Sequence, residues 1–238
     1  MQHYFGTIAD NQAIIDGKQL HHLIDVRRTT VGEKIEVSDG TDAYLCVVES
    51  LNPLFIKVLQ PIKEKRELDV ELTLAFALLK GDHNDLIVLK CTELGVGKLI
   101  PFVSSRCIVR PDGNSDNKLM RMRKKAEEGA MQSRRDVVPV VTDYMSFEDV
   151  LATPADIKLF AFEGMAGGSD DLISVCKKMP KRSHVLVVIG PEGGFSYEEA
   201  RLALDYDFEF VSLGRRILRA ETAAMYCASI IGAFSEVE

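Results

Sequence analysis

Two apolar runs in the last quarter of the chain each break at a glycine and each lead toward a helical pattern. The run Val185–Ile189 breaks into Gly190–Gly194, with the sequence GPEGG, and the run Phe208–Leu213 breaks at Gly214. Short apolar runs that alternate with helical patterns predict an α/β sheet. Loops that follow parallel strands meet at one edge of the sheet, where such folds bind ligands. The two glycine loops therefore predict one pocket.

The pattern of predicted secondary structure changes near residue 68. Before that point, short β-prone runs alternate with turn signals such as Asp39-Gly40, which predicts a small β-barrel with one short helix between residues 17 and 30. A charged run at residues 63–67 is the expected linker, and strand and helix patterns alternate beyond it. We expect two domains, residues 1–68 and residues 69–238, the second with a mostly parallel sheet.

The pattern also places the elements of the second domain. Ser196 and Glu199 match the S-x-x-E capping box, which predicts a helix directly after the GPEGG loop. The other expected helices cover residues 82–94, 119–133 and 222–234. The expected strands cover residues 70–78, 98–103, 137–141, 157–162, 185–189 and 208–213.

Composition narrows the class of protein. With 238 residues, 46% of them hydrophobic and 27% charged, the chain should bury a full core. No apolar stretch approaches the about 20 residues that cross a bilayer, and we expect no secretory signal. The five cysteines form no CxxC pair, and the five histidines lack metal-ligand spacing and are expected at surface or capping positions. These features predict a cytoplasmic protein without a metal site.

Several common site motifs are missing from the sequence. There is no G-x-G-x-x-G, no G-x-x-x-x-G-K-[ST] and no G-x-S-x-G. Dinucleotide sites, P-loop nucleotide sites and nucleophile elbows are therefore poorly supported.

Basic residues gather locally although the formal net charge is −7. One set lies on the predicted helix around residues 119–135 and consists of Arg121, Arg123, Lys124, Lys125, Arg134 and Arg135. Such a strip fits a partner with phosphates, but it also fits a solvated helix face, and both interpretations stay open.

A second basic set follows Gly214. Arg215, Arg216 and Arg219 lie within five positions, and Glu221 comes two residues later. Cations this close repel one another unless a carboxylate or an external anion such as RNA phosphate relieves them. The pattern predicts either an internal ion-pair network or an anionic substrate.

Four segments of the chain resemble one known family. GPEGG, LGRRILRAETAA, LLKGDHNDLIVLKCTELGV and QSRRDVVP are similar to segments of the RsmE family, the bacterial 16S ribosomal RNA uridine-N3 methyltransferases of the SPOUT superfamily. The resemblance covers nearly the whole chain, and the segments occur in the family's order. Met131 departs from the pattern, because the family usually has glutamate before this Gln-Ser pair.

The resemblance implies a fold and an activity. The fold would be an N-terminal PUA-like β-barrel that binds RNA, followed by a SPOUT α/β domain with a trefoil knot, a rare exception to unknotted topology. The cofactor would be S-adenosylmethionine, and the protein would act as a homodimer. The substrate would be N3 of one uridine, position 1498 in the standard numbering, of 16S rRNA in the small ribosomal subunit. An N3 target must be unpaired to react.

The resemblance and the local pattern together give three sets of candidate residues. The catalytic candidates are Arg219, which would stabilise charge on the uracil, and Glu221 and Glu192, either of which could accept the N3 proton. The cofactor candidates are Glu163, Ile189, Gly190, Pro191, Glu192, Gly193, Gly194, Leu213, Gly214, Ile217, Leu218 and Thr222. The RNA-binding candidates are Arg27, Arg28, Arg106, Arg123, Gln132, Arg135, Arg215 and Arg216.

Three alternatives remain at this point. The chain could be a knotted methyltransferase for another ribosomal or transfer RNA site. It could be a non-catalytic RNA-binding protein of ribosome assembly. An α/β enzyme for an unrelated small molecule is the weakest of the three, because it leaves the motif set unexplained.

Overall fold

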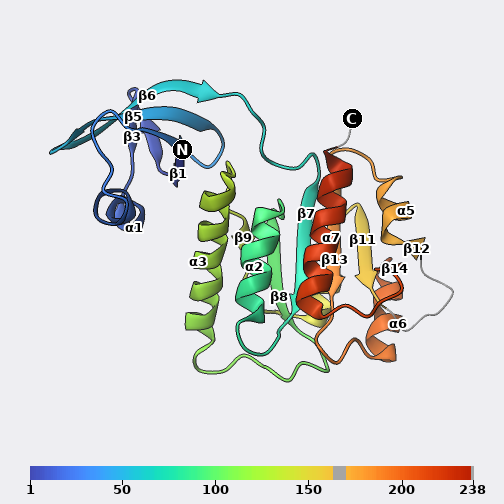
Figure 1. Cartoon of the computed structure of the whole chain (residues 1–238). Helices are drawn as coiled ribbons and strands as arrows, with labels where there is room; N and C mark the ends of the chain where they lie inside the picture. Colours follow the sequence, from blue (N-terminus) through green and yellow to red (C-terminus); the bar gives the residue numbers. More distant parts are fainter. Residues whose placement is uncertain (163–169, 237–238) are drawn as a thin grey trace. The chain divides into compact units, whose positions relative to one another are not determined.

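The chain divides into two units. The first contains Met1–Glu67 together with Ala130–Val138, and the second contains Leu68–Gly129 together with Pro139–Glu238. The computed structural model describes residues 1–162 and 170–236 (Figure 1). The later segment of the first unit was not foreseen from the sequence, because the helical pattern runs through residue 130 without a break.

The first unit is built on a six-stranded sheet with the order β1-β4-β5-β6-β3-β2. Strands β1 and β4 are parallel, and the other neighbours are antiparallel. Its elements are β1 (Gln2–Phe5), β2 (Thr7–Ala9), β3 (Gln12–Ile14), α1 (Gly17–His21), the π-helical turn η1 (His22–Val26), β4 (Lys34–Ser38), β5 (Ala43–Leu51) and β6 (Leu54–Ile62).

Local chemistry explains the hairpin between β4 and β5. Gly40 has a φ of 93°, which favours glycine, and the Asp39 side chain accepts hydrogen bonds from the backbone N–H groups of Thr41 and Asp42 at 3.0 and 2.9 Å. The hairpin predicted from Asp39-Gly40 is confirmed. Apolar residues of the strands, among them Tyr4, Ile35, Val37, Cys46 and Val48, form the core of this unit.

The second unit contains a parallel sheet with the order β10-β8-β7-β13-β11-β14-β12, and β9 also pairs with β8. Every pairing in it is parallel, as the alternating pattern predicts. The strands are β7 (Glu71–Ala77), β8 (Lys98–Val103), β9 (Val140–Val141), β10 (Met145–Ser146), β11 (Ile157–Ala161), β12 (Asp170–Asp171), β13 (His184–Ile189) and β14 (Glu209–Ser212).

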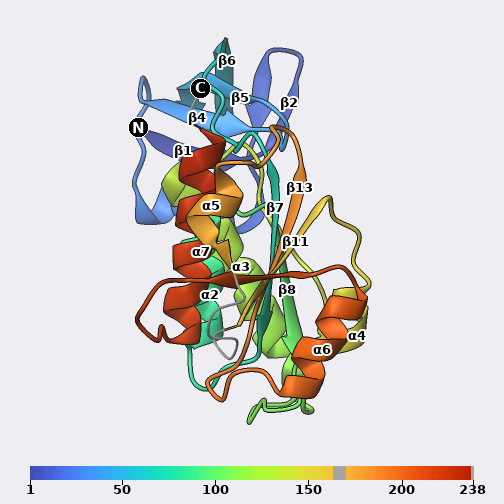
Figure 2. The same cartoon turned by 90° about the vertical axis from the view of Figure 1, so that its right-hand side faces the viewer.

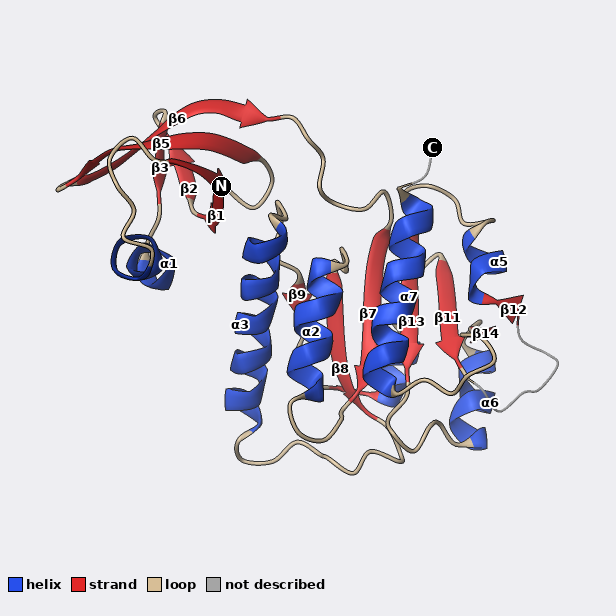
Figure 3. Cartoon of the chain, viewed as in Figure 1, coloured by secondary structure: helices blue, strands red, loops and turns tan. Residues whose placement is uncertain are grey.

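Helices lie on both faces of this sheet. They are α2 (His83–Glu93), α3 (Ser115–Ser133), α4 (Phe147–Leu151), α5 (Leu172–Cys176), α6 (Tyr197–Asp205) and α7 (Ala220–Ser235). Figures 2 and 3 show α2, α5 and α7 on one face, and Figure 2 shows α4 and α6 on the other. Because the sheet is covered on both sides, its central strand β13 is buried from Val185 to Ile189.

An aromatic cluster anchors the sheet beneath the GPEGG loop. The rings of Phe160 and Phe195 have centroids 4.2 Å apart, and Phe102 and Phe147 pack beside them. Phe195 is the residue directly after the loop, so its burial fixes the point where the chain leaves the loop for α6.

Several boundaries differ from the prediction. Helix α3 begins at Ser115, one turn before the expected residue 119, and the strand expected over residues 137–141 is reduced to Val140–Val141. The charged run at residues 63–67 is not a plain solvated linker, because Arg66 and Glu67 form ion pairs within the first unit. Their acidic and basic partners lie far away in the sequence, so the local pattern could not reveal them.

Candidate functional site

A cavity of about 1330 Å³ opens in the second unit, at the carboxyl edge of the parallel sheet. Loops that follow β8, β11, β13 and β14 contribute to its walls, together with β12 and with residues at the starts of α2, α6 and α7. Loops after parallel strands emerge on the same side, which explains why segments far apart in sequence meet here. The pocket predicted from the two glycine loops is thus present.

The GPEGG loop has a defined conformation. The Gly194 N–H donates to the carbonyl oxygen of Pro191 at 2.9 Å, and Gly194 has a φ of 64°. A side chain at Gly194 would be strained in this region although nothing lies within 4 Å of a Cβ there. The predicted capping box is confirmed, because Ser196 and Glu199 each bond to the other's backbone at the start of α6.

The second loop carries Arg215, Arg216 and Arg219 along the cavity. All three side chains are exposed, and within residues 1–162 and 170–236 none has a hydrogen bond or an ion pair. The internal ion-pair network is therefore absent from the described part of the chain, and the anion-binding interpretation is favoured. Gly214 turns the chain at a φ of 105°, and Ile217 is 84% exposed between the arginines.

Two carboxylates and a histidine lie in the same cavity. Glu192 accepts a hydrogen bond from the backbone N–H of Lys80 at 3.0 Å. Glu221, in the first turn of α7, lies 3.5 Å from Nδ1 of His83, measured to its Oε1. His83 was expected at a surface or capping position and was not among the candidates, although it belongs to the LLKGDHND segment that carries the family resemblance.

Arg106 also belongs to this cavity. Its guanidinium donates to the carbonyl oxygen of Gly193 at 3.1 Å. We predicted an RNA contact for Arg106, and the structure gives it an internal contact with the GPEGG loop. The sequence offered no signal for this contact, because 87 positions separate the two residues.

Most of the predicted cofactor and catalytic residues come together. The cavity is lined by Ile189, Gly190, Pro191, Glu192, Gly193, Gly194, Leu213, Gly214, Ile217, Leu218, Arg219 and Glu221. Thr222 is exposed and does not line it. Glu163 lies outside the described residues. Residues that the sequence did not single out include Phe162, Asp170, Asp171 and Tyr197.

The basic set of α3, which includes Arg134 and Arg135 directly after the helix, is largely paired with acids. Five of its six members have an ion-pair partner, with N–O distances of 2.5 to 3.7 Å. The pairs are Arg121–Asp85, Arg123–Asp143, Lys125–Glu128, Arg134–Glu36 and Arg135–Glu67. This arrangement favours the helix face stabilised by ion pairs over a free phosphate-binding strip.

Arg135 in particular is enclosed within the first unit. It is 3% exposed, and its Nε donates to Glu67 Oε2 at 3.1 Å. Glu67 also accepts the backbone N–H of Asp136 at 3.0 Å, and the Asp136 carbonyl accepts a hydrogen bond from Ser38 Oγ at 2.6 Å. The direct RNA contact predicted for Arg135 therefore conflicts with its burial, and we assign it a structural contact instead.

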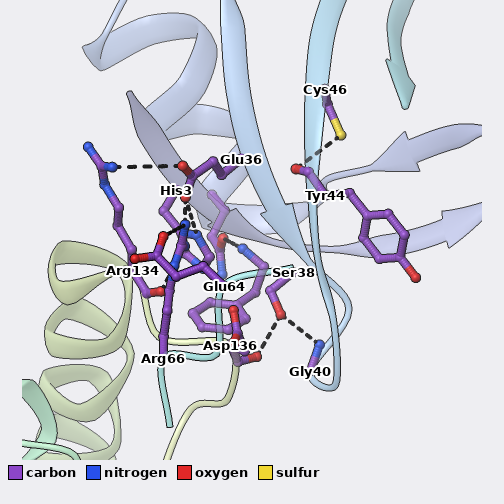
Figure 4. Close-up of polar contacts among 12 residues, drawn as sticks. His3, Glu36, Ser38, Gly40, Tyr44, Cys46, Glu64, Arg66, Arg134 and Asp136 are labelled. Atoms are coloured by element: carbon purple, nitrogen blue, oxygen red, sulfur yellow. Dashed lines mark hydrogen bonds and ion pairs between the residues drawn. The ribbon is translucent and has the colours of Figure 1, made fainter. Parts of the chain in front are cut away.

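A second buried network lies beside this one. His3 Nδ1 is 3.4 Å from Glu36 Oε2, which also receives a hydrogen bond from Arg66 at 2.8 Å (Figure 4). Burial lowers the pKa of His3. Burial opposes ionisation of Glu36, but the bonds from Arg66 and His3 prevail and hold its pKa below the ordinary value. The expected surface position is wrong for His3.

The remaining predicted RNA-binding residues are not part of the cavity lining. Arg27 and Arg28 are exposed after η1, and Gln132 is exposed in the last turn of α3. Arg123 donates to the Val141 carbonyl in addition to its pair with Asp143. Of the predicted RNA-binding residues, Arg106, Arg215 and Arg216 line the cavity.

The cavity fits S-adenosylmethionine. Phe162, Ile189 and Leu218 supply apolar surface, and the arginines supply positive charge that suits its carboxylate. The space beside Gly194 and Gly214 is open where a Cβ would stand, so a ligand can approach the backbone there. No group of three or more His, Cys, Asp or Glu side chains in the described residues is arranged to hold a metal ion. No helix among them is long and apolar enough to cross a membrane.

Comparison with known proteins assigns the family. The family described as RNA methyltransferase domain matches residues 66–232, and the RNA methyltransferase PUA domain matches residues 15–59. The protein named ribosomal RNA small subunit methyltransferase E from Bacillus subtilis is 34% identical over 252 residues, covering 100% of this chain and 98% of its own. The protein of that name from Synechocystis is 33% identical, covering 92% of this chain and 72% of its own.

A solved structure agrees with these relatives. The ribosomal RNA small subunit methyltransferase E from Neisseria gonorrhoeae, bound to S-adenosyl methionine, superposes with a TM-score of 0.83 at 28% identity, and 96% of each chain is covered. The N-terminal PUA-like unit and the C-terminal SPOUT fold predicted from the resemblance are confirmed. The chain therefore belongs to the RNA methyltransferases, in the ribosomal RNA small subunit methyltransferase E family.

Proposed function

We propose that the chain transfers a methyl group from S-adenosylmethionine to N3 of one uridine of 16S rRNA in the small ribosomal subunit. The observation that carries this proposal is the cavity, which combines two glycine loops with three arginines that lack an acid partner in the described chain. The glycine loops suit the cofactor, and the arginines suit an anionic polymer. The names of the relatives, which refer to the RNA of the small subunit, support this substrate.

Binding and alignment are the main tasks of the protein in this reaction. The segments Gly190–Gly194 and Leu213–Leu218 would hold the cofactor, which supplies an electrophilic methyl group on a sulfonium. The cavity walls would align uridine N3 with that methyl group. Alignment of this kind contributes roughly 7–11 kcal/mol in favourable cases.

Proton removal is the second task, because protonated N3 is a weak nucleophile. Glu221 or Glu192 would accept the proton, directly or through water. Arg219 would donate hydrogen bonds to a uracil carbonyl oxygen and stabilise the charge that develops on the ring. The absence of an acid partner for Arg219 in the described residues supports this role, since its guanidinium is available to a ligand.

The proposed RNA contacts follow from which basic side chains are exposed and which of them have an ion-pair partner. Arg215 and Arg216 would contact phosphates next to the target uridine, because they line the cavity and are exposed. Arg27 and Arg28 of the PUA-like unit would contact other phosphates of the RNA, and Gln132 and Arg123 remain weaker candidates. The uridine must leave any base pair to expose N3, and unpaired bases are the usual targets of sequence-specific RNA recognition.

Further features of the family remain part of the proposal. The PUA-like domain, residues 1–68, would hold RNA, and the domain of residues 69–238 would bind the cofactor, contain a trefoil knot and form a homodimer. The protein would act on small subunits in the cytoplasm. The odd, scattered cysteines support a reducing compartment, and all five are free and buried.

The test is methyl transfer to small ribosomal subunits that lack the modification. The protein is incubated with labelled S-adenosylmethionine, and the methylated nucleoside is identified by mass spectrometry. We expect 3-methyluridine at a single position of 16S rRNA. Methylation of transfer RNA or of another ribosomal position would replace the proposed substrate. Cofactor binding without transfer, beside an active control enzyme, would support a binding protein of ribosome assembly.

A further inference from the structure

A buried carboxylate lies behind the cavity wall and outside the catalytic set. Glu199, in the first turn of α6, is 7% exposed and does not line the cavity. Its Oε1 accepts hydrogen bonds from Ser104 Oγ and from the backbone N–H of Ser105, each at 2.8 Å. Its Oε2 accepts the backbone N–H of Ser196 at 2.8 Å.

These donors make an ionised carboxylate tolerable at a buried position. A buried charge is costly unless hydrogen bonds satisfy it, and Glu199 has three donors. Burial opposes its ionisation, but hydrogen bonds from Ser196 and Ser105 prevail and lower its pKa. The start of a helix also favours negative charge.

Glu199 joins two loops that the sequence keeps far apart. Oε2 closes the capping box directly after the GPEGG loop, and Oε1 holds the turn that follows β8. That turn is closed by a hydrogen bond from the Cys107 N–H to the Ser104 carbonyl at 3.1 Å, and it presents Arg106. Arg106 then donates to the Gly193 carbonyl. The network runs from the carboxylate to the cavity wall in two steps.

We infer that Glu199 is a positioning residue for the cofactor: it fixes the turn of Ser104 and Ser105 so that Arg106 holds the GPEGG loop in its binding conformation. The contact at Gly193 sets the orientation of the peptide before Gly194, which lines the cavity. Groups held by packed and hydrogen-bonded neighbours keep a binding geometry that a free loop would lose. The inference rests on the proposed cofactor, since the loop matters only if S-adenosylmethionine occupies the cavity.

The test measures S-adenosylmethionine binding by calorimetry together with thermal unfolding. Glu199→Ala should weaken cofactor binding about tenfold, because it removes all three hydrogen bonds to a charged group. Glu199→Gln can keep its amide oxygen toward Ser104 and Ser105, which hold the turn that presents Arg106, although its NH2 then faces the Ser196 N–H and that hydrogen bond is lost. It should recover most of the binding lost in Glu199→Ala, to within about threefold of the wild type. Ser146→Ala, which removes the side-chain cap of α4 away from the cavity, is the matched control for lost helix stability and should bind normally.

Arg106→Met tests the second step and does not depend on whether Glu199→Ala folds. It keeps the aliphatic stem of an exposed side chain and should weaken binding about as much as Glu199→Ala. Arg201→Met, on the exposed face of α6 and off the cavity, is its control. The double variant Glu199→Ala/Arg106→Met should be about as weak as the weaker single variant, because both changes break one chain of contacts.

The outcomes separate the two proposals. If Arg106→Met binds the cofactor as tightly as the wild type, the inference is wrong. It is also wrong if Glu199→Gln binds as poorly as Glu199→Ala, or if the two losses multiply in the double variant. If the wild-type protein itself does not bind S-adenosylmethionine, the proposed function fails, and the positioning role loses its basis. In methyl transfer, the KM for the cofactor should rise while kcat at saturation changes little.

Discussion

The basic residues of α3 and those of the loop after Gly214 look alike in the sequence but differ in the structure. Five of the six basic residues of the α3 set are paired with carboxylates, whereas Arg215, Arg216 and Arg219 have no such partner in residues 1–162 and 170–236. Both sets are dense clusters of positive charge. A cluster of basic residues predicts a phosphate partner only where the fold places no carboxylates beside it.

The difference follows from what surrounds each set. Four of the acids come from other parts of the chain: α2, β4, the run at residues 63–67 and the loop after β9. The fold brings each of them to its basic partner on α3 or directly after it. The loop after Gly214 borders an open cavity, so its charges face a space that a ligand can fill. Ion pairs that are internal to the protein stabilise it or orient its segments, whereas Arg215, Arg216 and Arg219, which have no acid partner among the described residues, are available for binding.

The largest loss of stability is expected for Arg135, the buried member of the basic set of α3. Arg135→Ala leaves Glu67 without its main charge partner and should lower the free energy of unfolding by about 3–5 kcal/mol. Urea denaturation measures this change. The folded variant should keep its RNA affinity within about twofold. If the variant is stable but has lost its RNA affinity, Arg135 contacts RNA, and the contrast between the two basic sets is wrong.

Arg219→Ala tests the unpaired set. Loss of its charge stabilisation should lower kcat about 10²–10³-fold while cofactor affinity and melting temperature stay near those of the wild type. Arg201→Ala, which removes an exposed arginine of α6, serves as the control for a changed surface charge. Unchanged turnover in Arg219→Ala, with cofactor binding intact, would remove this residue from the mechanism.

The His3 network predicts a pH dependence. Because burial lowers the pKa of His3, the folded protein binds this proton less readily than the unfolded chain does. Stability should therefore fall as the pH drops below about 6.5, the ordinary value, and should be regained above it. Glu36 acts in the same direction at lower pH, because its folded pKa is also lowered. Melting temperatures between pH 7.5 and 5.5 should fall less in His3→Gln than in the wild type, and equal slopes would contradict the prediction.

The smallest effect is expected at the exposed pairs of α3. Arg123→Ala removes a pair between side chains that are 48% and 85% exposed, and should cost only about 0–1 kcal/mol of stability. A loss of stability near that of Arg135→Ala would show that solvent exposure does not explain the difference between the Arg123–Asp143 and Arg135–Glu67 pairs.

Local patterns predicted much of the second unit. The capping box at Ser196, the strand ending at Val103 and the parallel sheet all follow from short stretches of sequence, where propensity and burial agree. The two glycine loops also predicted the cavity, because loops after parallel strands meet at one edge. For the same reason most cofactor candidates lie together.

Long-range contacts between side chains could not be predicted. Ser104 and Glu199 are 95 positions apart, and Arg135 and Glu67 are 68 apart, so no local spacing relates them. His83 was passed over because a lone histidine without ligand spacing gives no signal, and only the fold places it beside Glu221. The knot, the dimer and the role of Glu163 remain predictions from the family resemblance.

The salt dependence of RNA binding tests the contrast between the two basic sets most directly. Affinity for a small-subunit RNA fragment that contains the target uridine is measured over a range of salt concentrations for the wild type and two double variants. Arg215→Gln/Arg216→Gln should reduce the slope of log K against log salt by about two, one for each lost phosphate contact, whereas Arg121→Gln/Lys125→Gln should leave it unchanged. A slope that falls only in the second variant would show that the paired residues of α3, and not the loop after Gly214, hold the RNA.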